Sequence, residues 1–219
     1  MVHVHLSLTG DPFVDIGGIA FDFFQKRYPK DTPIELIEKV ANIYINQWNR
    51  KINSLFLNSK ITNPSIKTPL QETMSFYASM ENGDFKGFCK TCGANDLLFL
   101  AGRDTLPLSG SGSLVNFHYA WEKGTALCAS CHYKLFFVPL SVLILGGKLS
   151  LLQAFTKDTK KLWCALTVEK NFDQLTTGSS QGLLKSEYTN VTNALFYFAI
   201  QLIEDMKDRA FTNAQSLTL

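Results

Sequence analysis

Charge is scarce in this chain of 219 residues, of which 18% are Asp, Glu, Lys or Arg, and the formal net charge is +2. A chain so close to neutral does not form a general basic coat for nucleic acid, so any such surface would have to be local. A long hydrophobic run is also lacking, because the most apolar stretch, residues 135–145, is too short for a bilayer and contains Pro139. The first residues show no cationic stretch followed by an apolar one. We therefore expect a cytoplasmic protein with no secretion signal and no membrane span.

Catalytic motifs are lacking as well. The sequence contains no HExxH, GxSxG or Walker pattern and no paired-carboxylate motif. Asp11 and Asp15 could in principle serve as acid and base, but aspartates beside a turn more often accept hydrogen bonds from nearby backbone amides. We therefore expect no enzyme activity. A magnesium-dependent nuclease that uses Asp11 and Asp15 is the enzymatic alternative.

The most informative residues present are cysteines. Four of the five form two CxxC pairs, Cys89 with Cys92 and Cys128 with Cys131. Each CxxC places two thiolates on one tight turn, and two such pairs supply the four sulfur ligands of a closed tetrahedral zinc site. Gly93 directly follows the first pair and lets the backbone turn back. Residues 93–127 exceed the spacing of about 15–20 residues in a compact ribbon, so we expect an inserted excursion between the pairs. The pattern predicts a structural zinc ribbon whose metal does no chemistry.

Other uses of these cysteines are weaker alternatives. The second pair continues into His132 and so matches the c-type haem attachment signature, but haem would leave the first pair unexplained and needs an oxidising compartment. A thioredoxin-like role needs only one pair, and two structural disulfides would imply secretion. His118 and His132 could each replace a cysteine ligand, although we expect both to be bystanders. Cys164 lies in an apolar run and is expected to be a buried small hydrophobic residue.

The N-terminal part predicts a strand followed by helices. Residues 2–8 alternate between apolar and polar side chains, which is typical of a half-buried strand. Residues 9–12 have the composition of a turn, and an aromatic helix is expected over about residues 20–28. Thr32, with Pro33 after it and Glu35 at the third position, has the pattern of a capping box for a second helix with an apolar stripe. Residues 58–70 are expected to form a polar loop.

The C-terminal part predicts a core segment, a hairpin and a helix. Residues 135–145 are apolar enough to be buried. The apolar runs 149–155 and 161–168 flank a polar stretch, residues 156–160, and this arrangement indicates a hairpin. A final helix is expected over about residues 187–209, with a stripe of Val191, Leu195, Phe198, Leu202 and Met206.

Together these elements predict an α+β fold, a mixed strand and helix core with an inserted four-cysteine zinc ribbon and a C-terminal helix. We divide it into a strand–helix region, residues 1–83, a zinc-ribbon module, residues 84–134, and residues 135–219, which pack with the first region as one domain.

At this point the arrangement resembles a known family. Residues 9–18, Thr-Gly-Asp-Pro-Phe-Val-Asp-Ile-Gly-Gly, the two CxxC pairs after them, and the apolar stretch that ends in Gly146-Gly147 resemble the CRISPR-associated CXXC–CXXC family. The resemblance covers about residues 5–150. That family provides the large subunit of type I CRISPR surveillance complexes (Cascade), mainly of subtype I-B. Because such subunits are usually about twice this length and end in a helical bundle, the resemblance implies that this chain is the N-terminal part of one.

The resemblance implies a function rather than a reaction. A large subunit sits at the 5′ end of the crRNA beside the backbone and 5′-handle-binding subunits. It recognises the protospacer-adjacent motif in double-stranded DNA and helps to open the strands, while base pairing reads the remaining sequence. The implied partners are the crRNA, target double-stranded DNA, the neighbouring Cascade subunits and a helicase-nuclease or transposition proteins. A zinc-ribbon adaptor that binds proteins without nucleic acid is the alternative.

Candidate nucleic-acid contacts can be named only by their chemistry. Small residues could approach a minor groove and an amide could bond base edges there, and these candidates are Gly110, Ser111, Gly112 and Asn116. Cations that could bind phosphates lie around the first cysteine pair and at the expected hairpin, namely Lys86, Lys90, Arg103, Lys157, Lys160 and Lys161. The alternative for each is an ordinary solvated surface residue or a plain linker. The glycines of residues 10–18 could either let RNA or a neighbouring subunit approach the backbone or simply turn the chain.

Overall fold

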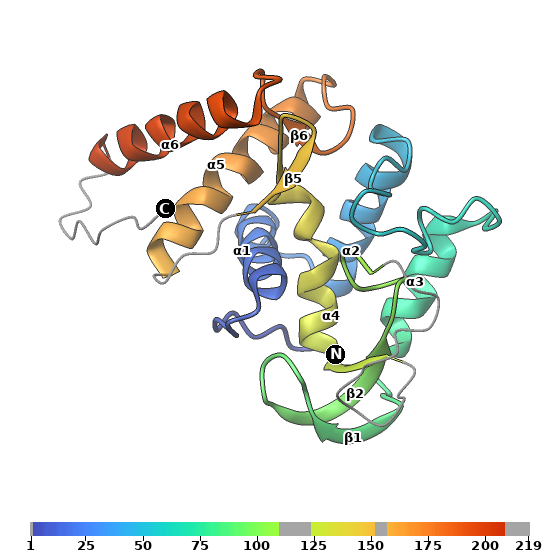
Figure 1. Ribbon diagram of the computed structural model, residues 1–219. Coiled ribbons are helices and arrows are strands. Elements are labelled where there is room, and N and C mark those ends of the chain that lie inside the picture. Colours follow the sequence, from blue (N-terminus) through green and yellow to red (C-terminus); the bar gives the residue numbers. More distant parts are fainter. Residues whose placement is uncertain (1, 110–123, 152–156, 209–219) are drawn as a thin grey trace.

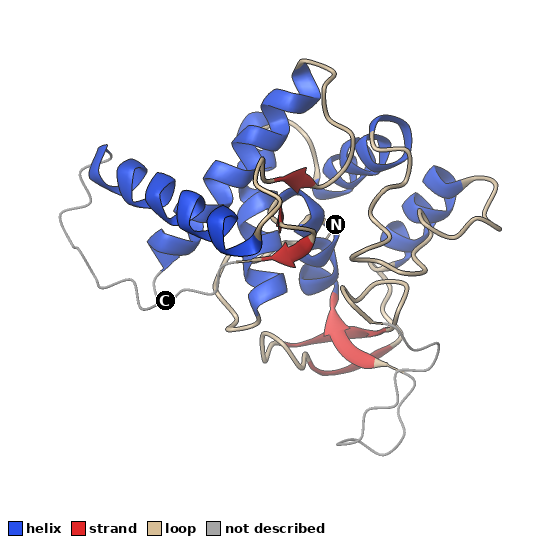
Figure 2. Ribbon diagram, turned by 45° about the horizontal axis from the view of Figure 1, so that its top comes forward, coloured by secondary structure: helices blue, strands red, loops and turns tan. Residues whose placement is uncertain are grey.

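The computed structural model describes residues 2–109, 124–151 and 157–208. Its helices are α1 (Pro12–Arg27), α2 (Pro33–Asn42), α3 (Pro69–Ser79), α4 (Ala129–Phe136), α5 (Lys157–Thr176) and α6 (Val191–Asp208), with a π-helical turn at Ile43–Gln47 and a 3-10 turn at Val138–Leu140. Its strands are β1 (Phe85–Phe88), β2 (Asn95–Ala101), β3 (Thr125–Cys128), β4 (Leu143–Leu145), β5 (Lys148–Ser150) and β6 (Leu184–Lys185). Helices are the main secondary structure and the strands form two small sheets (Figure 2). The predicted mixture of helix and strand with a C-terminal helix is confirmed.

Helix α1 occupies the centre of the molecule (Figure 1) and packs against α4, α5 and the 3-10 turn. Aromatic rings fill this core, with Phe24 in edge-to-face contact with Phe137 at 5.8 Å and with Phe172 at 5.9 Å between ring centroids. Such pairs add to the stabilisation that burial of their area provides. The apolar residues 135–145 are buried except for the half-buried Ile144, as the sequence predicted.

Two glycines allow α1 to approach α4 closely. A Cβ atom on Gly17 would lie 2.0 Å from the carbonyl oxygen of Lys134, and one on Gly18 would lie 3.2 Å from Lys134 Cδ. Both glycines are inside the helix, which begins at Pro12 with Asp11 as its cap. The predicted helix start near residue 20 was therefore wrong, because the glycines that suggested a turn serve close packing instead.

The N-terminal strand predicted over residues 2–8 was also wrong, since these residues contain neither strand nor helix. Val4 is buried, but Leu6 is 37% exposed, so the apolar side chains do not share one buried face. The backbone amide of His5 donates to Ser130 Oγ at 2.9 Å, at the start of α4, and makes no ladder hydrogen bond. A side-chain acceptor on α4 thus takes the place of a neighbouring strand.

The second helix was predicted correctly. Thr32 accepts from the Glu35 amide, and the Glu35 carboxylate accepts in turn from the Thr32 amide at 2.6 Å, which completes the capping box. Its apolar stripe is buried and continues through the π-helical turn to Trp48, whose Nε1 donates to Ser180 Oγ at 2.6 Å. The residues before Pro69 form a loop as expected, but α3, which follows, was not predicted.

The hairpin predicted around residues 156–160 was wrong, because residues 157–176 form α5. Its buried positions recur at helical spacing, but three of them are polar, namely Lys160, Thr167 and Asn171. Because these buried residues are polar, the sequence lacks the continuous apolar stripe that normally marks a core-facing helix. Within the described residues, the nearby hairpin is formed by β4 and β5 over Gly146 and Gly147, which have φ of +52° and +80°.

The C-terminal helix is confirmed, although α6 begins at Val191 rather than at residue 187. Ala194, Phe198 and Leu202 face the core, whereas Val191 and Leu195 of the predicted stripe are exposed. No helix within the described ranges is both long and apolar enough to cross a membrane. The division into residues 1–83, 84–134 and 135–219 stays a prediction.

Candidate metal centre

The two cysteine pairs are held by the ends of a three-stranded antiparallel sheet, β1-β2-β3 (Figure 1). Cys89 and Cys92 lie in the turn between β1 and β2, and Cys128 ends β3. Cys128 is also the N-cap residue of α4, whose first turn contains Cys131. The sheet and the helix therefore bring together residues that are far apart in the sequence.

The first pair lies on a tight, hydrogen-bonded turn. The Gly93 amide donates to the Cys89 carbonyl and the Cys89 amide to the Ala94 carbonyl, each at 2.9 Å. Gly93 has a φ of +73°, which a residue with a side chain rarely adopts, so glycine is needed there. The Lys90 amide donates to the Ala126 carbonyl at 3.0 Å and fastens this turn to β3, next to the second pair.

The four sulfur atoms converge. Cys89 Sγ lies 3.8 Å from Cys131 Sγ, Cys92 Sγ lies 3.6 Å from Cys128 Sγ, and all four lie within 4.8 Å of one another. A tetrahedral ion with metal–sulfur distances of about 2.3 Å requires sulfur–sulfur separations of about 3.8 Å. The four closely placed cysteines could therefore hold a metal ion. All five cysteines are free thiols, so neither pair forms a disulfide.

The electrostatics of the cluster also favour a cation. Hydrogen bonding with Cys128 and Cys131 lowers the pKa of Cys89 far below its ordinary value. The hydrogen bond to Cys131 lowers the pKa of Cys128, but the Cys89 hydrogen bond and burial outweigh it and raise the value to about 12. The pKa of Cys131 is raised further, because its hydrogen bonds to Cys128 and Cys89 oppose its ionisation. Four thiolates at these separations repel one another, so they can coexist only around a positive ion.

The neighbouring histidine does not join the cluster. Among the described residues, the grouped candidates for metal ligation are the four cysteines alone. His132 is buried between Phe76 and Phe99, with ring centroids 6.2 and 6.0 Å away, and neither ring nitrogen has a hydrogen-bond partner of good geometry. Burial lowers its pKa to about 4. His118 lies outside the described residues.

The fifth cysteine behaves as predicted for a small hydrophobic residue. Cys164, on α5, is fully buried, and burial raises the pKa of its thiol to about 12. Its sulfur lies 4.0 Å from the carbonyl oxygen of Ile16 on α1. It therefore belongs to the helical core and not to the cysteine cluster.

Six of the predicted nucleic-acid contacts, all of them cations, lie within the described residues. Lys86 and Lys90 are exposed beside the first pair, and Arg103 is half-buried. Lys161 is exposed on α5, where Lys157 begins the helix. Gly110, Ser111, Gly112 and Asn116 lie outside the described residues.

Lys160 corrects one of these predictions. It is buried, and its Nζ lies 2.8 Å from Asp15 Oδ2, so it is not a surface cation at a hairpin tip. Asp15 also accepts from the backbone amide of Thr9 at 2.6 Å and from its hydroxyl at 2.9 Å. Burial raises the pKa of Asp15, but the bonds from Lys160 and Thr9 outweigh it and bring the value below the ordinary 3.8.

Both N-terminal aspartates thus accept hydrogen bonds from nearby backbone amides, as the sequence predicted. Asp15 accepts from the Thr9 amide, and Asp11 Oδ1 accepts from the Val14 amide at 2.9 Å. Sequence analysis missed the ion pair between α1 and α5. The available signal was a lysine that shares the buried face of a helix with apolar residues. That helical spacing can be recognised only if residues 157–176 are taken to form a helix.

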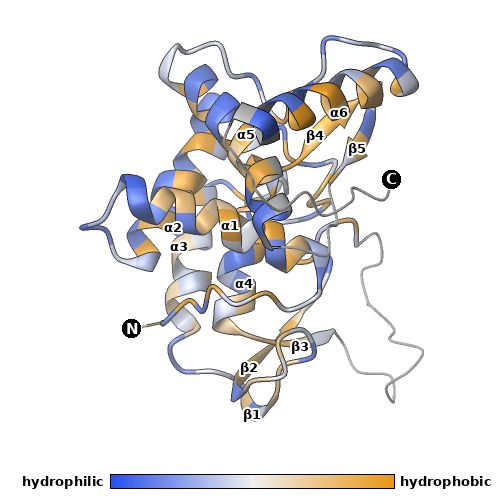
Figure 3. Ribbon diagram, turned by 90° about the vertical axis from the view of Figure 1, so that its left-hand side faces the viewer, coloured by the Kyte–Doolittle hydropathy of each residue, from blue (hydrophilic) through white to orange (hydrophobic). Residues whose placement is uncertain are grey.

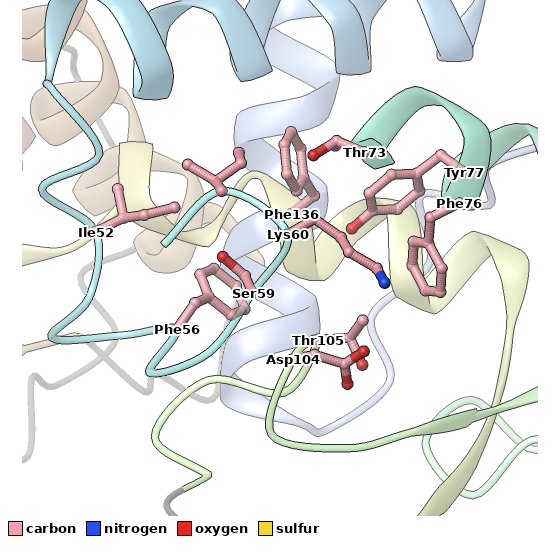
Figure 4. Close-up of a pocket in the computed structure, with 11 residues that line it drawn as sticks. Ile52, Phe56, Ser59, Lys60, Thr73, Phe76, Tyr77, Asp104, Thr105 and Phe136 are labelled. Atoms are coloured by element: carbon pink, nitrogen blue, oxygen red, sulfur yellow. The ribbon is translucent and has the colours of Figure 1, made fainter. Parts of the chain in front are cut away.

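A small pocket is lined by α3, the loop before it, the loop after β2 and the end of α4 (Figure 4). Its lining includes Lys60, Tyr77 and Asp104. The cavity measures about 20 Å³, which is room for a single water molecule. It is too small for an organic ligand.

Comparison with known proteins gives one finding. Residues 82–143 match the model of a family described as CRISPR-associated protein (Cas_CXXC_CXXC). No curated protein and no solved structure matches the chain. The match contains both cysteine pairs and most of the apolar segment after them, whereas residues 9–18 and Gly146-Gly147, which also suggested the resemblance, lie outside it. The segment that builds the four-cysteine cluster is therefore similar to the CRISPR-associated CXXC–CXXC family, the resemblance that the sequence also indicated.

Proposed function

We propose that this protein is a non-catalytic subunit of a crRNA-guided type I CRISPR effector complex, in which it contributes to motif recognition, DNA opening and assembly. The observation that carries the proposal is the family match over residues 82–143, which coincides with the cysteine cluster. In such complexes base pairing reads the target, so a protein subunit needs only a few contacts to a short duplex motif. Its partners would be the crRNA, double-stranded target DNA and the neighbouring Cascade subunits.

We also propose that the metal is zinc and that its role is structural. Four sulfur ligands suit zinc, and they leave no open position for water or substrate. Cys89, Cys92, Cys128 and Cys131 would hold the ion. When bound, zinc would supply the positive charge that lets four thiolates coexist, and it would fix the turn between β1 and β2 to the start of α4.

A non-catalytic role agrees with how the N-terminal carboxylates are used. Asp15 is engaged by Lys160 and Thr9, and Asp11 caps α1. A nuclease site would need carboxylate oxygens free to bind magnesium. The proposal would fail on this point if the purified protein cleaved DNA with a divalent metal and Asp11→Asn abolished the cleavage.

The exposed apolar side chains favour a second candidate function, that of a protein–protein adaptor. Phe88 on β1 is 68% exposed and Phe196 on α6 is 64% exposed. Hydrophobic residues run along α6 (Figure 3). Apolar residues that gather on a surface mark contacts with other proteins. An adaptor would use these contacts without binding nucleic acid.

Co-purification separates the two candidates. The tagged chain would be expressed with its genomic neighbours and a CRISPR array, and the purified material would be analysed for protein subunits and extracted nucleic acid. A stoichiometric particle that carries a discrete crRNA is the expected result. A protein that binds neighbouring subunits but carries no RNA would contradict the first proposal and support the adaptor.

A further inference from the structure

A cavity of about 200 Å³ lies between the N-terminal segment and helices α1, α4 and α5. Its polar lining comes from Ser7, Asp15, Asp22, Lys134 and Lys161, and the rest is apolar or glycine. No cysteine lines the cavity, so it is separate from the metal centre. The kind of ligand that the cavity could bind depends on which of its four charged side chains, two aspartates and two lysines, already have partners.

Both carboxylates are already neutralised by lysines that do not line the cavity. Asp15 Oδ2 pairs with Lys160 Nζ, and Asp22 Oδ2 pairs with Lys26 Nζ, each at 2.8 Å. Among the described residues, neither Lys134 nor Lys161 forms an ion pair. The lining therefore presents two positive charges that no carboxylate of the described chain balances.

Lys134 is the unusual member of this pair, because it is only 2% exposed. Its stem packs over Gly18, and its ammonium group makes one hydrogen bond, to the Ser7 carbonyl at 3.4 Å. That distance lies beyond the usual range for an N–H···O bond. A buried ammonium normally requires a charged partner or several hydrogen bonds, since its transfer from water is costly. Lys134 thus brings to the wall of the cavity a charge that no carboxylate of the described chain neutralises.

We propose that this cavity binds a phosphate group, with Lys134 and Lys161 as its charged ligands. Phosphate offers several strong acceptor oxygens to donors that arrive from different directions, here from α4 and α5. The volume is below the range of about 300–1,000 Å³ that is typical of pockets for drug-sized molecules. The cavity therefore suits a phosphate, or a phosphate with its sugar, rather than a complete nucleotide.

The phosphate could belong to a single strand of RNA or be free in solution. Binding of an RNA phosphate rests on the function proposed above, whereas binding of free phosphate does not. In both cases the two lysines would make the same contacts, so titrations with inorganic phosphate and with a short single-stranded RNA test the site together and tell the sources apart.

The test is a calorimetric titration of the purified full chain with inorganic phosphate and, separately, with the RNA. We expect Lys161→Ala to weaken binding about tenfold, which corresponds to loss of about 1.4 kcal/mol. Lys161→Arg should retain most of the affinity. Lys170→Ala is the matched control, because it removes the same charge from the same helix but outside the cavity lining. Its affinity should equal that of the wild type.

Lys134→Met gives a second test that does not depend on a loss of folding. Methionine keeps an apolar stem over Gly18 and removes the buried charge, so the melting temperature should not fall. Phosphate binding should nevertheless be lost.

Each result of the titrations has a distinct meaning. RNA binding that inorganic phosphate competes away and that Lys161→Ala weakens would identify a strand phosphate. Binding of inorganic phosphate alone, sensitive to both lysines, would identify a free phosphate. Absence of binding to either ligand, or binding that neither lysine affects, would overturn the proposal. If that happened while the wild type and both variants still formed a crRNA particle, the function proposed above would stand without this site.

Discussion

Two regions of this molecule are held together in different ways. In the sheet β1-β2-β3 all of β1 is exposed or half-buried, the partly buried strands β2 and β3 contact α4, and the ends of the sheet meet at four converging sulfur atoms. The helical region around α1 has an aromatic core and a buried ion pair between Asp15 and Lys160. A small sheet without a core of its own needs a metal or another cross-link, whereas a packed helical core does not. The first region should therefore depend on its metal and the second should be self-supporting.

Helix α4 belongs to both regions. Its start carries Cys128 and Cys131, and its later residues Lys134 and Phe136 pack into the helical core. Tyr44 donates to the carbonyl of Phe136 at 2.9 Å and so ties α4 to the segment after α2. Loss of the metal should consequently loosen the sheet and the first turn of α4 but leave the rest of the helix in place.

The largest expected effect follows from replacing a metal ligand. Cys89→Ser or Cys128→Ser should abolish stoichiometric metal binding, unfold the module locally and lower assembly of the complex. Structural zinc sites in zinc-finger peptides have apparent binding free energies of about 10–16 kcal/mol at neutral pH. Elemental analysis and limited proteolysis would measure the effect.

Cys164→Ala is the control for these variants, because Cys164 is a buried cysteine outside the cluster. It should keep the metal and lose only a modest part of the stability. Full assembly of a complex from metal-free Cys89→Ser protein would refute the structural role of the metal.

The next largest effect concerns the ion pair that fastens α1 to α5. Lys160→Met leaves Asp15 buried without its cation and should cost about 3–5 kcal/mol of unfolding free energy. In the double variant Asp15→Asn with Lys160→Met, the buried charge is gone and Asn can still accept from Thr9, so most of that loss should be recovered. Urea denaturation of the four proteins measures the coupling. Strictly additive losses would show that the two residues do not interact.

A smaller effect is expected where α1 meets α4. Gly17→Ala places a Cβ against the backbone carbonyl of Lys134, which cannot move freely, and should cost about 1–3 kcal/mol. Gly18→Ala meets the flexible side chain of Lys134 at 3.2 Å instead. There the higher helix propensity of alanine should offset most of the cost. Thermal melts that rank Gly18→Ala as the more damaging change would contradict this account of the helix contact.

The smallest effect is the acid response of the helical region. Because the folded state lowers the pKa of Asp15 below its ordinary 3.8, the ionised carboxylate stabilises the fold above that pH. This contribution should disappear as the pH falls below 3.8 and Asp15 takes up a proton. The stability difference between the wild type and Asp15→Asn should therefore shrink in acid. A difference that stays constant between pH 6 and pH 3 would exclude this assignment.

The sequence predicted the parts of this fold that depend on short-range chemistry. The spacing of the cysteines, the capping box at Thr32 and Glu35, and the buried nature of Cys164 are all local signals, and the structure confirms them. The candidate metal centre could be predicted because its four ligands are marked by residue type alone.

The errors arose where tertiary contacts override local pattern. The N-terminal alternation suggested a strand, yet the His5 amide bonds to a side chain of α4. Gly17 and Gly18 suggested a turn, yet they lie inside α1 because α4 approaches there. Lys160 was expected at the surface, yet it is buried and pairs with Asp15, which lies 145 positions earlier in the sequence. Each of these contacts joins residues that are far apart in the sequence, so short-range sequence patterns do not reveal it.

Hydrogen–deuterium exchange on metal-loaded protein, before and after treatment with a strong chelator, tests the central claim most directly. Elemental analysis of the same sample should first give about one zinc per chain. Chelation should then remove protection from β1, β2 and β3 while the amides of α1 and α5 stay protected. Equal loss of protection in both regions, or protection in the sheet that does not change, would contradict the distinction between a metal-held module and a self-supporting core.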